Sequence, residues 1–292
     1  MKKVRKAVIP VAGMGTRFLP VTKAVPKEIL PIVDKPTLQY IIEEAVSSGI
    51  EEILLITSPY KKVIEDHFDM SYELEARLEK SNKVNELQMV RDISKLAKIY
   101  YLRQGEPLGS GHAINLAKSF VGDEPFAVMF GDDLMYYKDK KPVLKQLIDV
   151  YEKFNCNVIG VNEVDPSLVY KYGIIKYSNE ETGKIETIVE KPKVGEAPSN
   201  SAGLGRYIIK PEIFTVLKDL KAGIGNEIQF TDGMKELMKS QDFYACKFDG
   251  IYFDTGSKIG YLKANLHYAL DHPELKNDLL KVIKELTESN KW

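Results

Sequence analysis

The sequence predicts an α/β protein in which a mixed, mostly parallel sheet is covered by helices on both faces. Short apolar segments alternate with helical ones through the first half of the chain, as in β-α-β units. One apolar segment, Phe126–Phe130, ends in Gly131-Asp132-Asp133, and open α/β sheets bind ligands where such strands end. We therefore expect a Rossmann-like core within one domain spanning residues 1–292.

Residues 1–165 are expected to form the first half of this domain. Strands are expected at Val4–Ile9, Glu52–Ile56, Lys98–Leu102, Phe126–Phe130 and Asn157–Val161. Helices are expected at Thr37–Ser48, Tyr60–Phe68, Ser110–Ser119 and Val143–Phe154. Residues 70–95 are charged, favour helix and lack glycine and proline, which predicts a helical insertion. Its role as a solvated flap, subunit contact or lid stays open.

The pattern changes in residues 166–256, which we expect to form a second half. Gly173–Tyr177 and Lys184–Glu190 predict a hairpin, and Ala202–Ile209 a further strand. Asp249-Gly250 predicts a second hairpin, between Phe243–Phe248 and Ile251–Phe253. The expected helices are Pro211–Leu217 and Thr231–Lys239, followed in the C-terminal part, residues 257–292, by Ser257–Leu270 and Pro273–Ser289.

Composition and charge exclude several classes of protein. The chain has 292 residues, of which 28% are charged, and a net charge of −1, so a basic surface for nucleic acid is not indicated. No apolar run approaches membrane-spanning length, and the N-terminus does not resemble a signal peptide. Cys156 and Cys246 lie far apart and predict reduced thiols. We therefore expect a cytoplasmic protein without membrane association.

The most informative segment, Ala12–Arg17, follows the first strand and has the sequence A-G-M-G-T-R. Its glycines allow the backbone to approach a ligand closely and to direct N–H groups at phosphate oxygens. The guanidinium of Arg17 matches a phosphate, and Lys27 adds a compact positive charge. The segment predicts a site for a nucleoside triphosphate.

Two better-known phosphate loops fit this segment less well. Dinucleotide-binding loops have a third glycine where this chain has Phe18, and Asp34, at the distance expected of a ribose ligand, reads better as part of a turn. No Gly-Lys-Ser/Thr follows, so a Walker A loop is absent. An NAD-dependent oxidoreductase stays open as an alternative of a different class.

A second loop, Gln104–Ala113, follows a strand and opens a helix. The side-chain amide of Gln104 carries both a donor and an acceptor, so it can bind the edge of a pyrimidine base. Glycines in the loop allow a base to lie against the backbone. After the phosphate loop, this segment predicts a base-binding site. His112 is expected to be structural.

These motifs resemble those of the sugar-1-phosphate nucleotidylyltransferases, and among them the group that transfers a uridylyl group to glucose 1-phosphate. The similarity rests on G-x-G-T-R followed by P-K-E, and it extends through most of the chain. The resemblance implies that Arg17, Lys27 and Lys191 are catalytic. It also implies that nucleotide is bound by Ala12, Gly13, Gly15, Thr16, Glu28, Gln104 and Gly109, the last two at uracil-reading positions.

The resemblance also implies a magnesium site. Asp132 matches the metal-binding aspartate of the family, and Asp254 its second metal-side aspartate. Mg²⁺ prefers one or two carboxylates together with phosphate oxygens. Asp133 is expected to point the other way if the strand geometry persists, and Asp254 by itself could cap the following helix.

The sugar side is implied by Val189-Glu190-Lys191-Pro192, which resembles the family's E-K-P motif. A glutamate accepts hydrogen bonds from sugar hydroxyls, and a lysine pairs with a sugar phosphate. Adjacent residues of a regular strand point to opposite faces, so we expect a twist or bulge at Lys191. Gly173 and Gly203 match positions beside the sugar, although Gly203 replaces a bulkier apolar residue.

The implied reaction joins UTP and glucose 1-phosphate into UDP-glucose and pyrophosphate, with Mg²⁺ as cofactor. A homodimer or homotetramer is expected from the resemblance alone. The alternatives are a glucose-1-phosphate thymidylyltransferase, against which Glu28 and the insertion argue, and a nucleotide-sugar sensor without turnover. A retaining glycosyltransferase is disfavoured because such enzymes hold their metal with Asp-x-Asp, whereas here the two aspartates are adjacent.

Overall fold

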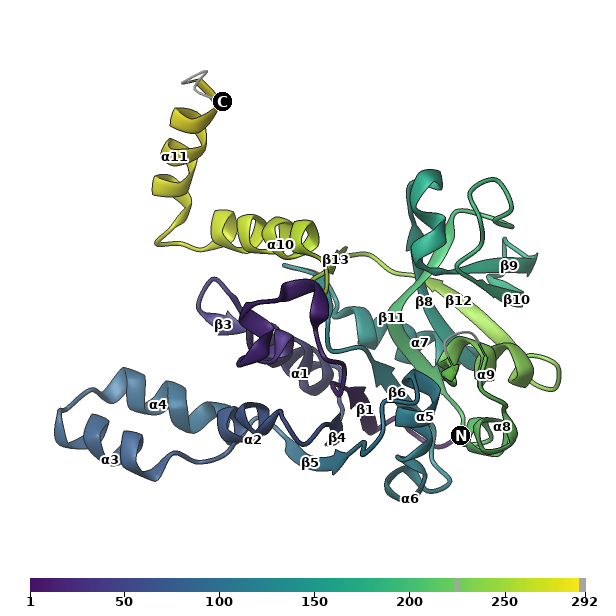
Figure 1. Ribbon diagram of the computed structural model, residues 1–292, viewed down its shortest axis with the longest axis horizontal. Coiled ribbons are helices and arrows are strands. Elements are labelled where there is room, and N and C mark those ends of the chain that lie inside the picture. Colours follow the sequence, from purple (N-terminus) through teal and green to yellow (C-terminus); the bar gives the residue numbers. More distant parts are fainter. Residues whose placement is uncertain (224–225, 289–292) are drawn as a thin grey trace.

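The computed structural model describes residues 1–223 and 226–288, and its centre is a nine-stranded sheet (Figure 1). The strand order is β5-β4-β1-β6-β11-β8-β12-β10-β9. In chain order these strands are β1 (Lys6–Pro10), β4 (Glu52–Thr57), β5 (Lys98–Arg103), β6 (Phe126–Met129), β8 (Asn157–Glu163), β9 (Gly173–Asn179), β10 (Lys184–Glu190), β11 (Ser201–Ile209) and β12 (Phe243–Lys247).

The sheet changes character at β11. The strands β5, β4, β1 and β6 run parallel to one another, whereas β11 is antiparallel to both β6 and β8. Beyond it, β12 is parallel to β8, and the β9–β10 hairpin is antiparallel. The expected mixed sheet is confirmed, with its parallel part in the first half of the chain.

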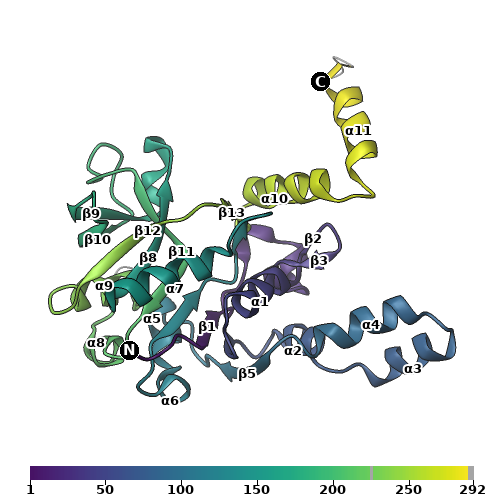
Figure 2. The ribbon, with the colours of Figure 1, turned by 180° about the vertical axis from the view of Figure 1, so that it is seen from behind.

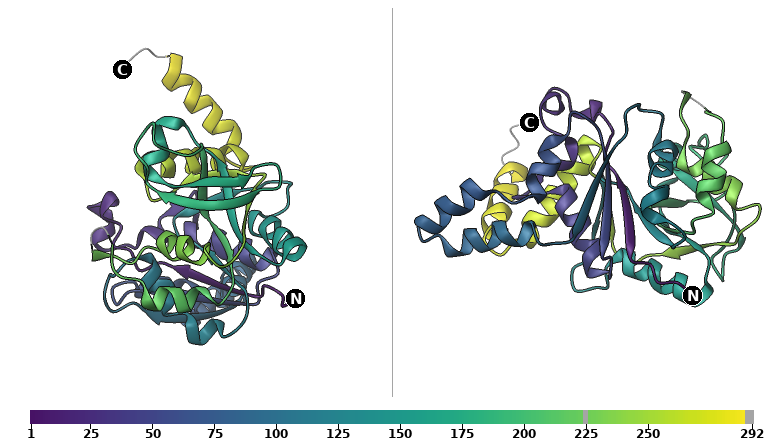
Figure 3. Two further views of the ribbon diagram at one scale, coloured as in Figure 1. Left: turned by 90° about the vertical axis from the view of Figure 1, so that its right-hand side faces the viewer. Right: turned by 90° about the horizontal axis from the view of Figure 1, so that it is seen from below.

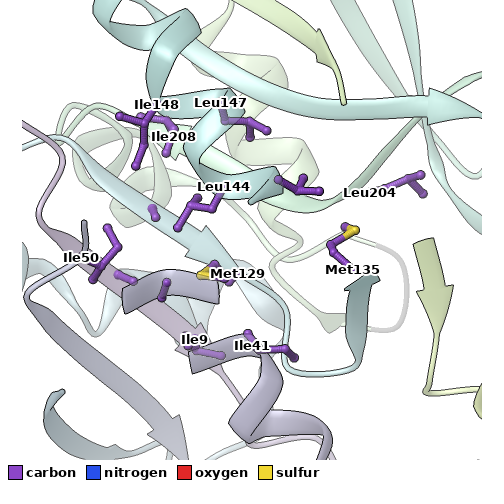
Figure 4. Close-up of a cluster of buried hydrophobic side chains, with 14 of the residues drawn as sticks. Ile9, Ile41, Ile50, Met129, Met135, Leu144, Leu147, Ile148, Leu204 and Ile208 are labelled. Carbon is purple, nitrogen blue, oxygen red and sulfur yellow. The ribbon is translucent and has the colours of Figure 1, made fainter. Parts of the chain in front are cut away.

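Helices cover both faces of the sheet (Figure 3). One face carries α1 (Thr37–Ser47), α2 (Lys62–Phe68) and α7 (Val143–Phe154); the other carries α5 (Ser110–Asn115), α6 (Lys118–Val121), α8 (Ile213–Asp219) and α9 (Phe230–Leu237). The alternation along β1 explains both layers: Ala7 and Ile9 are buried on the first face and Val8 on the second. Figure 4 shows part of the first layer, in which Ile41 of α1 and Leu144 of α7 join a single cluster.

The predicted hairpin between Phe243–Phe248 and Ile251–Phe253 is wrong. β12 pairs with β8 and β10, whereas β13 (Ile251–Asp254) forms a separate two-stranded sheet with β7 (Asp133–Tyr136). Phe253 of β13 packs with Ile32 and Leu134 in a small buried cluster, so tertiary packing overrides the local turn signal. The pairing places Asp254 directly opposite Asp133.

The insertion and the C-terminal part extend from the body (Figures 1 and 2). The insertion contains α3 (Tyr72–Lys80) and α4 (Val84–Ile93), joined by an ion pair in which Arg91 Nε lies 3.0 Å from Glu75 Oε2. The C-terminal helices are α10 (Lys258–Asp271) and α11 (Lys276–Glu288); Ser289, the expected last helical residue, lies outside the described residues. A short sheet of β2 (Pro31–Ile32) and β3 (Lys35–Pro36) precedes α1.

None of the helices in the described part of the chain has the length and apolar character needed to cross a membrane.

One ion pair lies wholly inside the core. Arg206 of β11 and Glu44 of α1 have side chains that are 0% and 1% exposed. The guanidinium donates to both carboxylate oxygens and to the Gly205 carbonyl, and Glu44 Oε1 also accepts from the Leu144 backbone N–H. The pair ties the strand that joins the two halves of the sheet to α1 and α7.

We expect Arg206→Met to lower the free energy of unfolding by about 3–5 kcal/mol, because it leaves the Glu44 carboxylate buried without its partner. Urea denaturation followed by circular dichroism measures this change. The control is Arg77→Met, which removes an ion pair to Glu73 on the surface of α3. Equal effects of the two substitutions would contradict a structural role for the buried pair.

Candidate active site

The phosphate loop leaves the end of β1 and folds over the start of the segment that carries Lys27. Gly15 has φ of 66° and precedes a short 3-10 turn at Thr16–Phe18. Thr22 Oγ1 donates to the Gly15 carbonyl at 2.8 Å, and a Cβ at Gly15 would lie 3.4 Å from Lys27 Cβ. A Cβ at Gly13 would meet nothing within 4 Å, so that part of the loop stays open to a ligand.

Lys27 and Asp132, two of the site residues that the sequence singled out, contact each other. Lys27 Nζ lies 2.5 Å from Asp132 Oδ2, which follows the end of β6. Burial alone would lower the pKa of Lys27, but the carboxylates of Asp132 and Glu28 raise it above its usual value. Burial likewise works to raise the pKa of Asp132, but the charge of Lys27 lowers it. Both groups are therefore held in their charged forms.

Asp254 lies on the other side of this centre. Its Oδ2 is 3.8 Å from Arg17 Nη1, and a Cβ at Gly256 would lie 2.4 Å from Asp132 Oδ2 and 3.0 Å from Asp254 Oδ1. The two carboxylates therefore flank the same position, which a side chain would fill. Ser257, and not Asp254, caps α10 with its side chain, so Asp254 is free of that structural role.

These two carboxylates fit a hard divalent cation. The described residues contain no group of three or more His, Cys, Asp or Glu side chains arranged to hold a metal. A cation here would therefore need further oxygen ligands from a bound molecule. Two carboxylates completed by phosphate oxygens are a common ligand set for Mg²⁺.

Asp133 points away from this centre, as the strand geometry predicts. Its Oδ1 accepts from the Tyr252 hydroxyl at 2.7 Å, and its side chain lies so close to Gly205 that a Cβ there would clash. Burial and the neighbouring Asp132 raise the pKa of Asp133 to about 7. The side chains of Asp133 and Asp132 therefore point in different directions, and their pKa values are shifted in opposite directions.

The base loop forms a smaller cavity of about 240 Å³ beside the phosphate loop, lined by Ala12, Gly13, Lys27, Glu28, Gln104 and Gly109 among others. Gln104 is buried, and its Nε2 lies 3.2 Å from the Gly109 carbonyl and 2.9 Å from His112 Nδ1. His112 thus orients Gln104. Gly109 has φ of 99°, and its backbone packs against Ile228.

Glu28 lies under this cavity in an ion pair that the sequence did not predict. Both of its carboxylate oxygens accept from Lys61 Nζ, at 2.9 and 2.7 Å. Lys61 stands just before α2, at the start of the helix predicted for Tyr60–Phe68, and no motif marked its side chain.

A larger cavity of about 650 Å³ is lined by residues of both halves of the domain, and its lining includes the expected sugar-side residues Gly173, Glu190, Lys191 and Gly203. Lys191 has φ of 45°, so the chain leaves strand geometry there and Glu190 and Lys191 face the same cavity. Lys191 Nζ lies 3.4 Å from Glu190 Oε1. The expected twist at Lys191 is confirmed.

The two cavities meet at Ser110, Phe130 and Asp132, which line both. Ser110 Oγ donates to Gln229 Oε1 at 3.2 Å and accepts from the Phe230 backbone N–H. Gln229 carries no local sequence signal, because only the fold places it against the base loop. The smaller cavity, beside the phosphate and base loops, and the larger cavity, beside Glu190 and Lys191, therefore lie on either side of Asp132.

Comparisons with known proteins show the family to which this chain belongs. A family model described as nucleotidyl transferase matches residues 6–270, and this chain belongs to that family. A UTP–glucose-1-phosphate uridylyltransferase of Staphylococcus epidermidis is 51% identical over 288 residues, which cover 98% of this chain and 99% of that protein. The uridylyltransferase of Bacillus subtilis is 50% identical over 288 residues, covering 98% of each chain.

Solved structures agree with this assignment. A UDP-glucose pyrophosphorylase from Acinetobacter baumannii has a TM-score of 0.88 and 39% identity, covering 97% of this chain and 99% of that one. A UDP-glucose pyrophosphorylase complexed with UDP-glucose has a TM-score of 0.84 and 42% identity, covering 92% and 100%. A putative glucose-1-phosphate thymidylyltransferase from Bacillus anthracis, at 22% identity and a TM-score of 0.69, shares the fold.

We expect Gly109→Ala to lower the free energy of unfolding by about 1–3 kcal/mol, because the positive φ strains an alanine and its Cβ would lie 2.5 Å from the Ile228 carbonyl oxygen. The control is Gly105→Ala in the same loop, where a Cβ would meet nothing within 4 Å. Thermal and urea unfolding measure both. A Gly109 variant as stable as the Gly105 variant would contradict the tight packing of the base loop.

Proposed function

We propose that this protein transfers the uridylyl group of UTP to α-D-glucose 1-phosphate and releases UDP-glucose and pyrophosphate. The observation that carries the proposal is the junction of two cavities at Asp132, one beside the phosphate loop and Gln104, the other beside Glu190 and Lys191. The near full-length identity to curated uridylyltransferases supports the same reaction.

The nucleotide lies in the smaller cavity. Backbone groups of Ala12, Gly13, Gly15 and Thr16 receive the phosphates, since the glycines leave room for close approach. Gln104 and Gly109 bind uracil: His112 and the Gly109 carbonyl fix the Gln104 amide nitrogen and thereby orient its oxygen.

The reaction needs no nucleophile from the protein, because the attacking group is already an anion. A phosphate oxygen of glucose 1-phosphate attacks the α-phosphorus of UTP in line, forming one P–O bond as the bond from that phosphorus to the pyrophosphate oxygen breaks. Lys27 and Arg17 stabilise the developing charge and hold the triphosphate. Lys27 is well suited because its neighbouring carboxylates keep it protonated.

Asp132 and Asp254 hold the magnesium ion that we propose as cofactor, since their carboxylates flank one position. When bound, Mg²⁺ neutralises charge on phosphate oxygens. Lys27 lowers the pKa of Asp132 and so keeps this potential ligand ionised, and Arg17 lies beside Asp254.

The sugar phosphate lies in the larger cavity. Glu190 binds glucose hydroxyls, Gly173 and Gly203 leave room for the ring, and Lys191 binds the phosphate. A Cβ at Gly173 would lie 2.8 Å from Ile188 Cδ1 and 3.3 Å from Glu190 Oε2, so a side chain there would displace the hydroxyl-binding carboxylate.

The alternatives receive less support. Membership of the nucleotidyl transferase family argues against the hypothesis of an NAD-dependent oxidoreductase. The putative thymidylyltransferase structure is only 22% identical, so it supports the fold and not that activity. A sensor without turnover would not need Lys27, Asp132 and Asp254 gathered at one point. A homodimer or homotetramer and a cytoplasmic location remain parts of this proposal, and light scattering after gel filtration tests the oligomeric state.

The test of the function is pyrophosphate release with glucose 1-phosphate and Mg²⁺, comparing UTP with dTTP, ATP, CTP and GTP, each with an EDTA control. We expect strong release with UTP that EDTA abolishes. A preference for dTTP would turn the proposal to a thymidylyltransferase, and no release with any nucleotide would overturn it.

We expect Lys191→Ala to raise the KM for glucose 1-phosphate about tenfold or more, with little change in the KM for UTP, because it removes a charged hydrogen-bond donor from the sugar phosphate alone. Steady-state kinetics with each substrate varied in turn measure the effect. Lys193→Ala, an exposed lysine that lines neither cavity, is the control. An equal loss for both substrates would count against this role.

A further inference from the structure

Lys61 and Glu28 form a buried ion pair directly behind the nucleotide cavity. Their side chains are 7% and 1% exposed, and both Glu28 oxygens accept from Lys61 Nζ. Such a pair is costly to bury and is seldom more stabilising than apolar residues of the same size. Its presence beside a polyanion site therefore calls for a function other than stability.

Two contacts connect this pair to Lys27 and Asp132 at the centre of the site. Glu28 directly follows Lys27, which contacts Asp132. Glu28 also lies against the peptide that precedes Asp132, because a Cβ at Gly131 would lie 3.5 Å from Glu28 Cγ. A change in the charge or position of Glu28 would consequently reach both Lys27 and Asp132.

Each member of the pair depends on the other to stay charged. Burial raises the pKa of Glu28, while the charges of Lys61 and Lys27 oppose that rise. Burial lowers the pKa of Lys61, and the charge of Glu28 opposes it. Without Lys61, Glu28 would be a buried carboxyl facing the place where the triphosphate binds.

We propose that Lys61 is a positioning residue for the nucleotide site, whose ammonium neutralises Glu28 and holds the segment Lys27–Ile29 against Asp132. Lys61 lines neither cavity, and it is connected to the nucleotide cavity through Glu28, which lines it. The inference rests on the proposed binding of UTP, and it adds a residue that no motif of the sequence identified.

This role differs in a measurable way from a purely structural one. Without Lys61 the pKa of Glu28 rises further, so its carboxyl repels an anionic ligand only at a pH high enough to keep it ionised. That repulsion grows with the charge of the ligand, whereas a distorted cavity weakens binding of charged and uncharged ligands alike. Comparing UTP with uridine therefore separates the two roles.

The experiment measures equilibrium binding of UTP and of uridine at alkaline pH, where Glu28 is ionised, to wild type, Lys61→Met, Lys61→Arg, Glu28→Gln and the double variant Lys61→Met with Glu28→Gln. We expect Lys61→Met to weaken UTP binding about tenfold or more and uridine binding much less. Lys61→Arg keeps the charge and should retain most of the UTP affinity. In the Glu28→Gln background, where no carboxylate needs neutralising, Lys61→Met should cost much less UTP affinity than it costs in the wild type.

The matched control is Lys62→Met, the next residue along the chain, whose side chain is 77% exposed in a surface pair with Asp66. It should leave UTP binding unchanged. If Lys61→Met does not fold, Lys61→Gln, which keeps a donor to Glu28 without the charge, takes its place and should show the same selective loss of UTP.

Equal weakening of UTP and uridine, or a Lys61→Met substitution that costs as much UTP affinity in the Glu28→Gln background as in the wild type, would overturn the inference. A wild-type protein that binds no UTP would instead overturn the proposed function. A wild type that binds UTP, with a Lys61→Met variant that binds it equally well, would overturn the role of Lys61 alone.

Discussion

The contact between Lys27 and Asp132 is the interaction on which the rest of the site depends. A carboxylate in this position, largely removed from water, would tend to take up a proton, and the ammonium at 2.5 Å keeps it ionised. Asp132 can therefore serve as a cation ligand only while Lys27 is held beside it. The phosphate loop packing on Lys27, and the Lys61–Glu28 pair behind it, both serve to fix this contact.

The topology of the sheet explains why the two cavities share an edge. β11 runs antiparallel to β6, so the end of β6 that carries Asp132 meets the start of β11, where Gly203 and Gly205 line the sugar cavity. The pairing of β13 with β7 then places Asp254, which comes late in the chain, opposite Asp133 and so beside this edge. Reversing one strand thus brings the two halves of the chain to a single centre, and the buried Arg206–Glu44 pair anchors the strand that does so.

The sequence predicted the parts of the site that come from continuous segments. The phosphate loop, the base loop and Glu190-Lys191 each follow a strand, and local turn chemistry marked all three. Contacts between segments that are distant in the chain could not be predicted from the sequence. Nothing local links Lys61 to Glu28 or Gln229 to Ser110, and Asp249-Gly250 predicted a hairpin that the packing of Phe253 with Ile32 and Leu134 prevents.

The charged side chains around the two cavities would not attract anionic substrates strongly by themselves. Acidic side chains outnumber basic ones in the lining, which includes Arg17, Lys27, Lys171 and Lys191 on one side and Glu28, Asp132, Asp133, Glu190, Glu227 and Asp254 on the other. Lys61 cancels one of these acidic charges from behind, and a pKa of about 7 leaves Asp133 partly neutral. The remaining carboxylates face the place where two polyanions must meet. Binding them both calls for additional positive charge, and the carboxylates of Asp132 and Asp254 fit the divalent cation that we propose would provide it.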